Sequence, residues 1–352
     1  MAYETGTATS PNNLLEKLKD FLVNDDGWTL DSFTDDTYRY YPTGAGSAGK
    51  RLHVHKTPSS AGSGDPDMYF NFRSTAGLDL ITEDGETNTY LTGYRGSVQG
   101  IAVNGSTGYD AGENWDQQPG YAVDQSADSF AMCINGLSLS SIPAYHFFAD
   151  GDTVVVVVEF QTGKFQFLSF GCVEKQGTYT GGHFFSGSFS SAYAYYYQND
   201  VSIDNYGPYF FAAGVSSITG AVYYDADGSA EWRICGGAYY TNIFPCPSGQ
   251  TSNGPYSRRG LCGAFLTSAP NSYNTIATLC PIYILGPRTS TNRSLLGHPK
   301  SIRFLNQSLY TAAQEITYGG DTWIVFNTIS HNNATALSYL NTGCGFAVKK
   351  VV

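Results

Sequence analysis

Two histidines two positions apart are the first residues whose spacing suggests chemistry. His53 and His55 lie in the alternating segment 51–56, which is typical of a β-strand, so we expect their side chains on one face of a sheet. Two imidazoles on one face can bind zinc, but no third ligand follows at a typical spacing. The sequence therefore favours a pair of surface histidines, and we predict no metal site.

Acidic residues suggest two further kinds of site. Asp225 and Asp227 resemble the start of a calcium loop, but Gly236 stands where an EF-hand requires an acidic residue. A hairpin turn explains this segment better, because Asp and Gly are turn residues. A glycosidase needs two carboxylates across a cleft, and Glu159 and Glu231 are the most conspicuous candidates. For both, a carboxylate on the solvent face of a strand is the commoner case.

Motifs for nucleophilic and phosphate chemistry are absent from the sequence. Gly181-Gly182-His183 is similar to part of an oxyanion loop, but the chain has no G-x-S-x-G elbow to accompany it. No glycine-rich phosphate loop ends in Lys-Ser or Lys-Thr. We therefore predict no catalytic residue and no cofactor, so the chain is not expected to be an enzyme. A glycosidase of the depolymerase type is the third hypothesis that we weigh.

The composition points to a surface with few charges. Only 14% of the 352 residues are charged, against about 25% in a typical soluble domain, and the net charge is −11. Such a surface is built from Ser, Thr, Asn, Gly and Tyr, which suits contacts with subunits or sugars. Basic residues are adjacent only at Lys50-Arg51, Arg258-Arg259 and Lys349-Lys350, so we expect no nucleic-acid binding.

Neither a membrane span nor a leader is expected. No window of about 18 apolar residues occurs. The segment Met1 to Thr5 lacks the basic and apolar blocks of a signal peptide, which predicts synthesis and folding in a cytoplasm.

The seven cysteines are odd in number and form no C-x-x-C pair, which excludes a zinc ribbon or thioredoxin motif. Small or apolar neighbours flank most of them, so we predict buried, reduced thiols. Pairing of Cys235 with Cys246, or of Cys262 with Cys280, stays open.

One helix is predicted near the N-terminus. Ser10 is a suitable N-cap and Pro11 fits the first helical position. Residues 24–27, Asn-Asp-Asp-Gly, should end the helix. Its apolar residues recur at helical spacing, and we expect them to dock on the body or on a neighbouring subunit. They are Leu14, Leu15, Leu18, Phe21 and Leu22.

Beyond Trp28 the pattern becomes that of short β-strands. The clearest pair is 153–160, with five consecutive valines, and 164–170, joined by Thr162-Gly163. Further strands are predicted at 51–56, 68–73, 221–225, 229–235, 275–285, 322–329 and 345–352. The predicted fold is mainly β, an antiparallel sandwich or barrel-like body with a short N-terminal α-helix. We divide it into segments 1–30, 31–180 and 181–352, although one domain is an alternative.

Aromatic side chains supply the candidate binding residues. They could form a sugar-stacking platform, but core packing or a subunit interface is favoured because Tyr is enriched at interfaces. The set comprises Tyr193, Tyr195, Tyr196, Tyr197, Trp232, Tyr239 and Tyr240.

Both ends and the middle of the chain resemble virion structural proteins of tailed bacteriophages. The opening Met1 to Thr9 is followed by a leucine-rich helix and Gly27-Trp28-Thr29. The central pattern has an aromatic pair before Asp-Gly and then a Val-rich strand. The remaining anchors are 68–73, 162–165, 170–171, 174–175, 177–182, 321–323 and 345–350. They cover about a third of the chain, and residues 187–320 match nothing that we can place.

The resemblance implies a tail-associated, collar or baseplate-type protein. Such a protein would form a homo-oligomeric ring or sleeve, contact other virion proteins, and reside in the virion after assembly in the host bacterial cytoplasm. A protein that binds a host-surface carbohydrate or receptor through residues 190–240 is the alternative.

Overall fold

The computed structural model describes the parts of the chain that form its sheets and their connections. These parts are residues 2–36, 49–59, 64–76, 99–115, 117–122, 130–134, 142–161, 163–187, 189–190, 221–225, 231–235, 278–282, 284–287, 293–306, 310–327 and 344–351.

The predicted helix is present and is capped as its sequence indicates. Helix α1 (Pro11–Asp20) begins after Ser10, whose Oγ accepts a hydrogen bond from the Asn13 backbone N–H at 3.1 Å. The helix continues as one π-helical turn, η1 (Phe21–Asp25), before Gly27 reverses the chain with a φ of 72°. All five predicted docking residues are at most 1% exposed and pack inside this chain.

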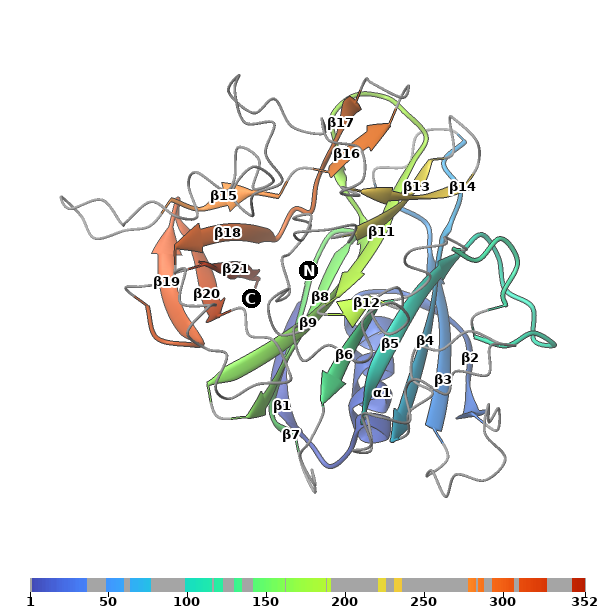
Figure 1. The fold of residues 1–352 in the computed structure, drawn as a ribbon, viewed down its shortest axis with the longest axis horizontal. Coiled ribbons are helices and arrows are strands. Elements are labelled where there is room, and N and C mark those ends of the chain that lie inside the picture. The colour runs from blue at the N-terminus through green and yellow to red at the C-terminus, as the bar shows by residue number, and fades with distance from the viewer. Residues whose placement is uncertain are drawn as a thin grey trace, which may run out of the picture.

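A seven-stranded antiparallel sheet forms the middle of the fold (Figure 1). Its order is β1-β7-β8-β9-β11-β13-β14. The strand bounds are β1 Ala2–Ala8, β7 Ile142–Asp150, β8 Thr153–Gln161, β9 Lys164–Cys172, β11 Gly181–Gly187, β13 Ala221–Asp225 and β14 Glu231–Cys235. The predicted hairpin of residues 153–170 is therefore confirmed as β8 and β9, which lie at the sheet's centre.

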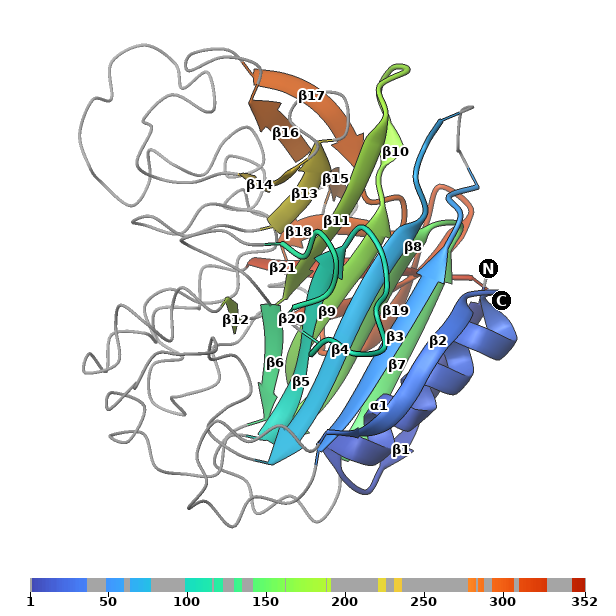
Figure 2. The same ribbon diagram turned by 90° about the vertical axis from the view of Figure 1, so that its right-hand side faces the viewer.

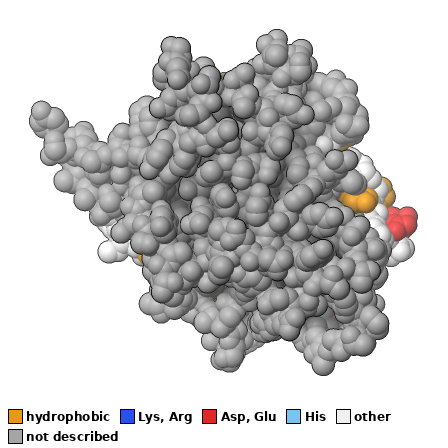
Figure 3. All heavy atoms as spheres, in the orientation of Figure 1, with side chains coloured by type: hydrophobic (Ala, Val, Ile, Leu, Met, Phe, Trp, Pro, Cys, Tyr) orange, Lys and Arg blue, Asp and Glu red, His pale blue; other side chains and the backbone are white. Residues whose placement is uncertain are grey.

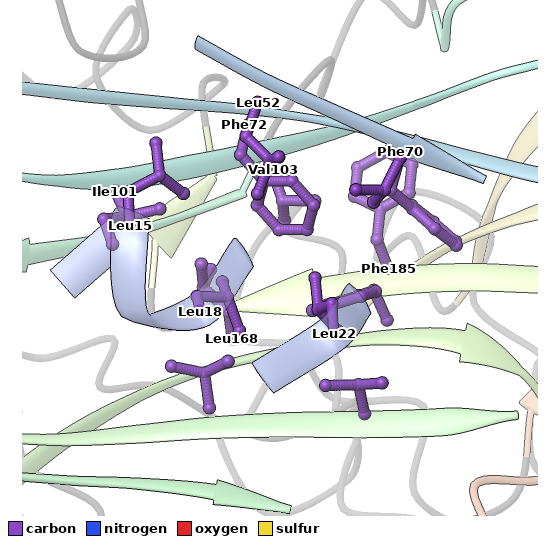
Figure 4. Packing of buried hydrophobic residues seen from close by; sticks show 14 of the residues in the cluster. Leu15, Leu18, Leu22, Leu52, Phe70, Phe72, Ile101, Val103, Leu168 and Phe185 are labelled. Carbon is purple, nitrogen blue, oxygen red and sulfur yellow. The ribbon is translucent and has the colours of Figure 1, made fainter. Parts of the chain in front are cut away.

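A six-stranded sheet covers one face of the middle sheet, as Figure 2 shows. Its order is β12-β6-β5-β4-β3-β2. The bounds are β2 Thr29–Asp36, β3 Gly49–Lys56, β4 Met68–Ala76, β5 Gln99–Ser106, β6 Phe130–Ile134 and β12 Phe189–Ser190. Helix α1 and η1 pack between the two sheets, and Figure 4 shows Leu15 close to Ile101, Leu18 close to Leu168 and Leu22 close to Phe185.

Two smaller sheets, made from the C-terminal third of the chain together with β10, cover the other face. The five-stranded sheet has the order β15-β18-β21-β20-β19, and a three-stranded sheet has the order β10-β17-β16. The bounds are β10 Glu174–Lys175, β15 Cys280–Pro281, β16 Ile284–Pro287, β17 Arg293–His298, β18 Ile302–Asn306, β19 Gln314–Tyr318, β20 Asp321–Asn327 and β21 Cys344–Lys350.

The valine run of β8 is explained by this three-layered arrangement. Val154, Val156 and Val158 lie in the core shared with α1 and the six-stranded sheet. Val155 and Val157 point the other way, into the core shared with the five-stranded sheet. A strand buried on both faces needs continuous rather than alternating apolar residues. The mainly β, sandwich-like fold with one short N-terminal helix is thus confirmed.

Two details of the predicted organisation differ in the structure. The apolar run 275–285 does not form one strand, because β15 ends at Pro281 and β16 starts at Ile284 in another sheet. Proline lacks the N–H needed to continue the ladder. Strand β11 pairs with β9 across the division at residue 180/181, and β1 pairs with β7 across the division at residue 30/31, so one sheet draws on all three segments. Within the described residues, no helix has the length and apolar character required to cross a membrane.

Candidate functional site

A group of buried charged and polar side chains surrounds the turn between β7 and β8. Gly151 and Asp152 form this two-residue turn, Asp150 pairs with Thr153, and Gly151 has a φ of 68°. Asp150 and Asp152 are only 1% and 8% exposed. We call these residues and their polar partners the turn cluster.

Asp152 fixes the connection that leaves β3. Its carboxylate accepts hydrogen bonds from the Ser59 backbone N–H at 2.9 and 2.8 Å and from Ser59 Oγ at 2.8 Å. Asp150 faces the opposite side of the turn, where Lys300 Nζ lies 3.1 Å from its Oδ1. Lys300 stands between β17 and β18, so the two carboxylates link the turn to both outer layers.

Lys56, the last residue of β3, adds a third link. Its ammonium donates to Asp26 O at 2.8 Å, Asp26 Oδ2 at 3.1 Å and Gly151 O at 3.1 Å, and lies 5.7 Å from the centre of the Trp28 ring. Trp28 Nε1 donates to the same Asp26 carboxylate at 2.9 Å. Burial raises the pKa of Asp26 despite these donors.

A third ion pair lies on the β11 side of the cluster. Lys175 Nζ is 2.7 Å from Asp65 Oδ2, and Asp65 Oδ1 accepts from the Gly181 N–H at 3.0 Å. Both side chains are at least nine-tenths buried. Tyr179 OH donates to Leu296 O at 2.9 Å, which joins the same region to β17.

Cys172 and His183 form the pair in the turn cluster whose residue types suggest nucleophilic chemistry. They lie opposite each other on β9 and β11. Burial raises the pKa of the Cys172 thiol to about 12 and lowers the pKa of His183 to about 4. Both groups are therefore neutral near pH 7, whereas a catalytic cysteine needs its thiolate. His183 instead stacks on Tyr224, with ring centroids 5.8 Å apart.

The turn cluster thus has the chemistry of a structural junction. Its carboxylates are held by ammonium groups or by backbone and hydroxyl donors from other layers. Within the parts of the chain that the structure describes, no three His, Cys, Asp or Glu side chains converge to hold a metal ion.

The histidine pair is partly corrected by the structure. His55 is half-buried, with Nδ1 2.9 Å from Asp31 Oδ1. His53 is not a surface residue: it is 3% exposed, and its Nδ1 lies 2.8 Å from Asn71 Oδ1. The reason is that segment 107–122 covers this face of β3, placing Tyr109 5.2 Å from the His53 ring.

Trp232 is the one predicted aromatic site residue that the structure describes. Its ring is 7% exposed and packs in the core, and Nε1 donates to Gly120 O at 3.0 Å. A ring in this position cannot stack on a sugar. The other predicted aromatics lie outside the described residues: Tyr193, Tyr195, Tyr196, Tyr197, Tyr239 and Tyr240.

The remaining candidates fit structural roles. Glu159 Oε1 accepts from the Gly163 N–H at 2.7 Å and so supports the β8–β9 turn. Glu231 pairs with Asp225 in the β13–β14 ladder, and its side chain and residues 226–230 lie outside the described part of the chain. Cys172 is buried and free, as predicted. The side chains of the other six cysteines lie outside the described part of the chain.

The sequence indicates the turn at Asp150–Asp152 but does not reveal its partners Lys56, Ser59 and Lys300, nor the neighbouring ion pair of Asp65 and Lys175. Asp65 has only the pattern of a turn residue, and the others have no distinguishing local pattern. Comparison with known proteins adds no assignment, because the sequence matches no protein-family model and no curated protein.

Proposed function

We propose that this chain is a structural component of a bacteriophage particle, assembling as a homo-oligomer at the tail, collar or neck, or baseplate. The observation that carries the proposal is the middle sheet, whose central strands β7, β8, β9 and β11 are buried on both faces and which the turn cluster joins to both outer layers. Ion pairs and hydrogen bonds between the layers resist sliding of one layer past another. A subunit under mechanical stress requires this resistance.

The nature of the surface supports self-assembly. With 14% charged residues, a large part of the surface must be uncharged, and repeated contacts between copies bury such surface at little desolvation cost. On the face drawn in Figure 3, hydrophobic and acidic side chains lie together at the right-hand margin. The similarity of both ends and the centre to tailed-phage virion proteins supports the same role.

The proposal places the protein in the virion, after assembly in the host bacterial cytoplasm, with copies of itself and other virion proteins as partners. Its role is to hold geometry rather than to catalyse a reaction. The neutral thiol of Cys172 and the paired carboxylates of the turn cluster are in keeping with that role.

Two measurements test the proposal together. Native mass spectrometry of the purified chain should give one closed homo-oligomer, and mass spectrometry of purified particles should detect the chain at a fixed ratio to the other virion proteins. A chain that is monomeric and missing from particles would overturn the proposal.

A further inference from the structure

Strand β19 is an edge strand of the five-stranded sheet, and β20 is its one neighbour among the described strands. Strand β19 pairs with β20 from Gln314↔Val325 to Tyr318↔Asp321, and Gly319-Gly320 close this hairpin with positive φ values. Among the described residues, no strand pairs with the opposite edge of β19. In Figure 1, β19 lies at the left-hand margin of the strands that the structure describes. Such an edge is a template for pairing with another chain.

The hairpin geometry determines which backbone groups point outward. In an antiparallel pair closed by a two-residue turn, the closing pair is hydrogen-bonded and every second pair after it is too. Tyr318 and Ile316 therefore direct their N–H and C=O groups towards β20. Glu315 and Thr317 direct theirs away from it, to the open edge.

We propose that two copies of this chain pair antiparallel along β19, about a two-fold axis at Ile316. In this register Glu315 of each copy stands opposite Thr317 of the other, and each of these pairs exchanges both of its N–H···O=C hydrogen bonds. The two Ile316 side chains meet as a close, non-hydrogen-bonded pair. This inference rests on the proposed homo-oligomer and names one of its contacts.

The charges and side chains of β19 agree with this register. Its one carboxylate, Glu315, is held by Lys350 Nζ at 2.7 Å and would face a neutral Thr317. Ile316 is half-buried and packs on the apolar cluster that contains Trp323. Tyr318 is 40% exposed and would come beside Gln314 of the other copy. The contact thus extends an existing apolar cluster across the axis.

Two other edge strands, β2 and β1, are less suitable. Strand β2 carries Asp31, Asp35 and Asp36, so pairing it with its own copy would gather the carboxylates of both copies in one short ladder. Strand β1 has a register shift between Gly6 and Ala8, and such irregularities protect an edge from pairing.

Thr317→Pro tests the contact without removing a bond of the hairpin, because the Thr317 N–H points to the open edge. A proline there should abolish pairing at β19 while the far-ultraviolet circular dichroism is unchanged. Thr317→Ala is the matched control, since it shortens the side chain but keeps the N–H. By native mass spectrometry, we expect the Ala variant to match the wild type and the Pro variant to lose every species that needs the β19 contact.

A cross-link provides an independent readout. Ile316→Cys should form an intermolecular disulfide on oxidation, found as a peptide that joins position 316 of one copy to position 316 of the other, because the two Cβ atoms of such a pair lie about 5 Å apart. Tyr318→Cys is the control, since its two copies are separated by several residues along the ladder. If folded Thr317→Pro assembles like the wild type and the Ile316→Cys variant forms no such peptide, the β19 contact is wrong but the homo-oligomer stands. A monomeric wild-type chain would overturn both.

Discussion

Asp152 holds Ser59 by three hydrogen bonds, although the two residues are 93 positions apart. Asp152 belongs to the turn of the middle sheet, and Ser59 belongs to the connection that leaves the six-stranded sheet. The carboxylate is 8% exposed. Hydrogen bonds to a charged acceptor in such surroundings are among the stronger ones in proteins.

Asp152→Ala should therefore lower the free energy of unfolding by about 2–3 kcal/mol, because it leaves the Ser59 N–H without its acceptor. Ser59→Ala removes only the hydroxyl contact and should cost about 1 kcal/mol. Urea unfolding followed by fluorescence measures both. Glu113→Ala is the control, since Glu113 is exposed and should change the stability by less than about 0.5 kcal/mol. Equal effects of all three variants would contradict the role of Asp152.

Gly171 is required where β9 passes the same turn. Its φ is 129°, and a Cβ added there would lie 1.8 Å from Asp152 O. Gly171→Ala should destabilise the fold by about 3 kcal/mol or more, through steric overlap and backbone strain. Gly163→Ala provides the comparison: its φ is 70° and a Cβ would meet no atom within 4 Å. It should cost only about 1 kcal/mol. Thermal unfolding of both variants checks the difference.

The elements predicted from sequence are those whose pattern is local. Ser10 and Pro11 mark the start of α1, and the valine run with its Thr-Gly turn marks β8 and β9. Strand β1 is not predicted because residues 2–8 lack a run of apolar residues, and it is held mainly by pairing with β7. Its position depends on a contact with a strand far along the chain, which no local pattern records.

The turn cluster could be predicted only in part, for the same reason. Asp150-Gly151-Asp152 indicates a turn, but the partners Ser59 and Lys300 come from two other layers. The burial of His53 likewise depends on segment 107–122, which folds over β3. In each case the missing information is which segment covers which face, and that is a property of the assembled sheets.

The three-layered fold predicts that neighbouring valines of β8 contribute equally to the free energy of unfolding. Val156 and Val157 point into different cores, and both are fully buried. Truncation to alanine should cost about 2 kcal/mol at each position. Leu30→Ala, at a residue 40% exposed, should cost well under half as much. If one of the two valine variants were as stable as the wild type in urea unfolding, one face of β8 would be solvent-exposed and the three-layered arrangement wrong.

The buried imidazole of His183 predicts a loss of stability in acid. Its pKa is about 4 in the folded chain, against an ordinary value of 6.5, because burial disfavours the charged ring. The unfolded chain therefore binds a proton at a higher pH than the folded chain does. The contribution of His183 to stability is fully present above pH 6.5 and falls as the pH drops towards 4.

Between about pH 7.5 and pH 5, this single group should remove about 2 kcal/mol from the free energy of unfolding. His183→Phe retains an aromatic ring beside Tyr224 and cannot be protonated. Between the two pH values, the free energy of unfolding of this variant should therefore fall by about 2 kcal/mol less than that of the wild type. Urea unfolding at the two pH values, for both proteins, gives this difference directly. His146, whose pKa burial also lowers to about 4, is present in both and cancels. Identical pH dependences would show that His183 is not buried as a neutral ring.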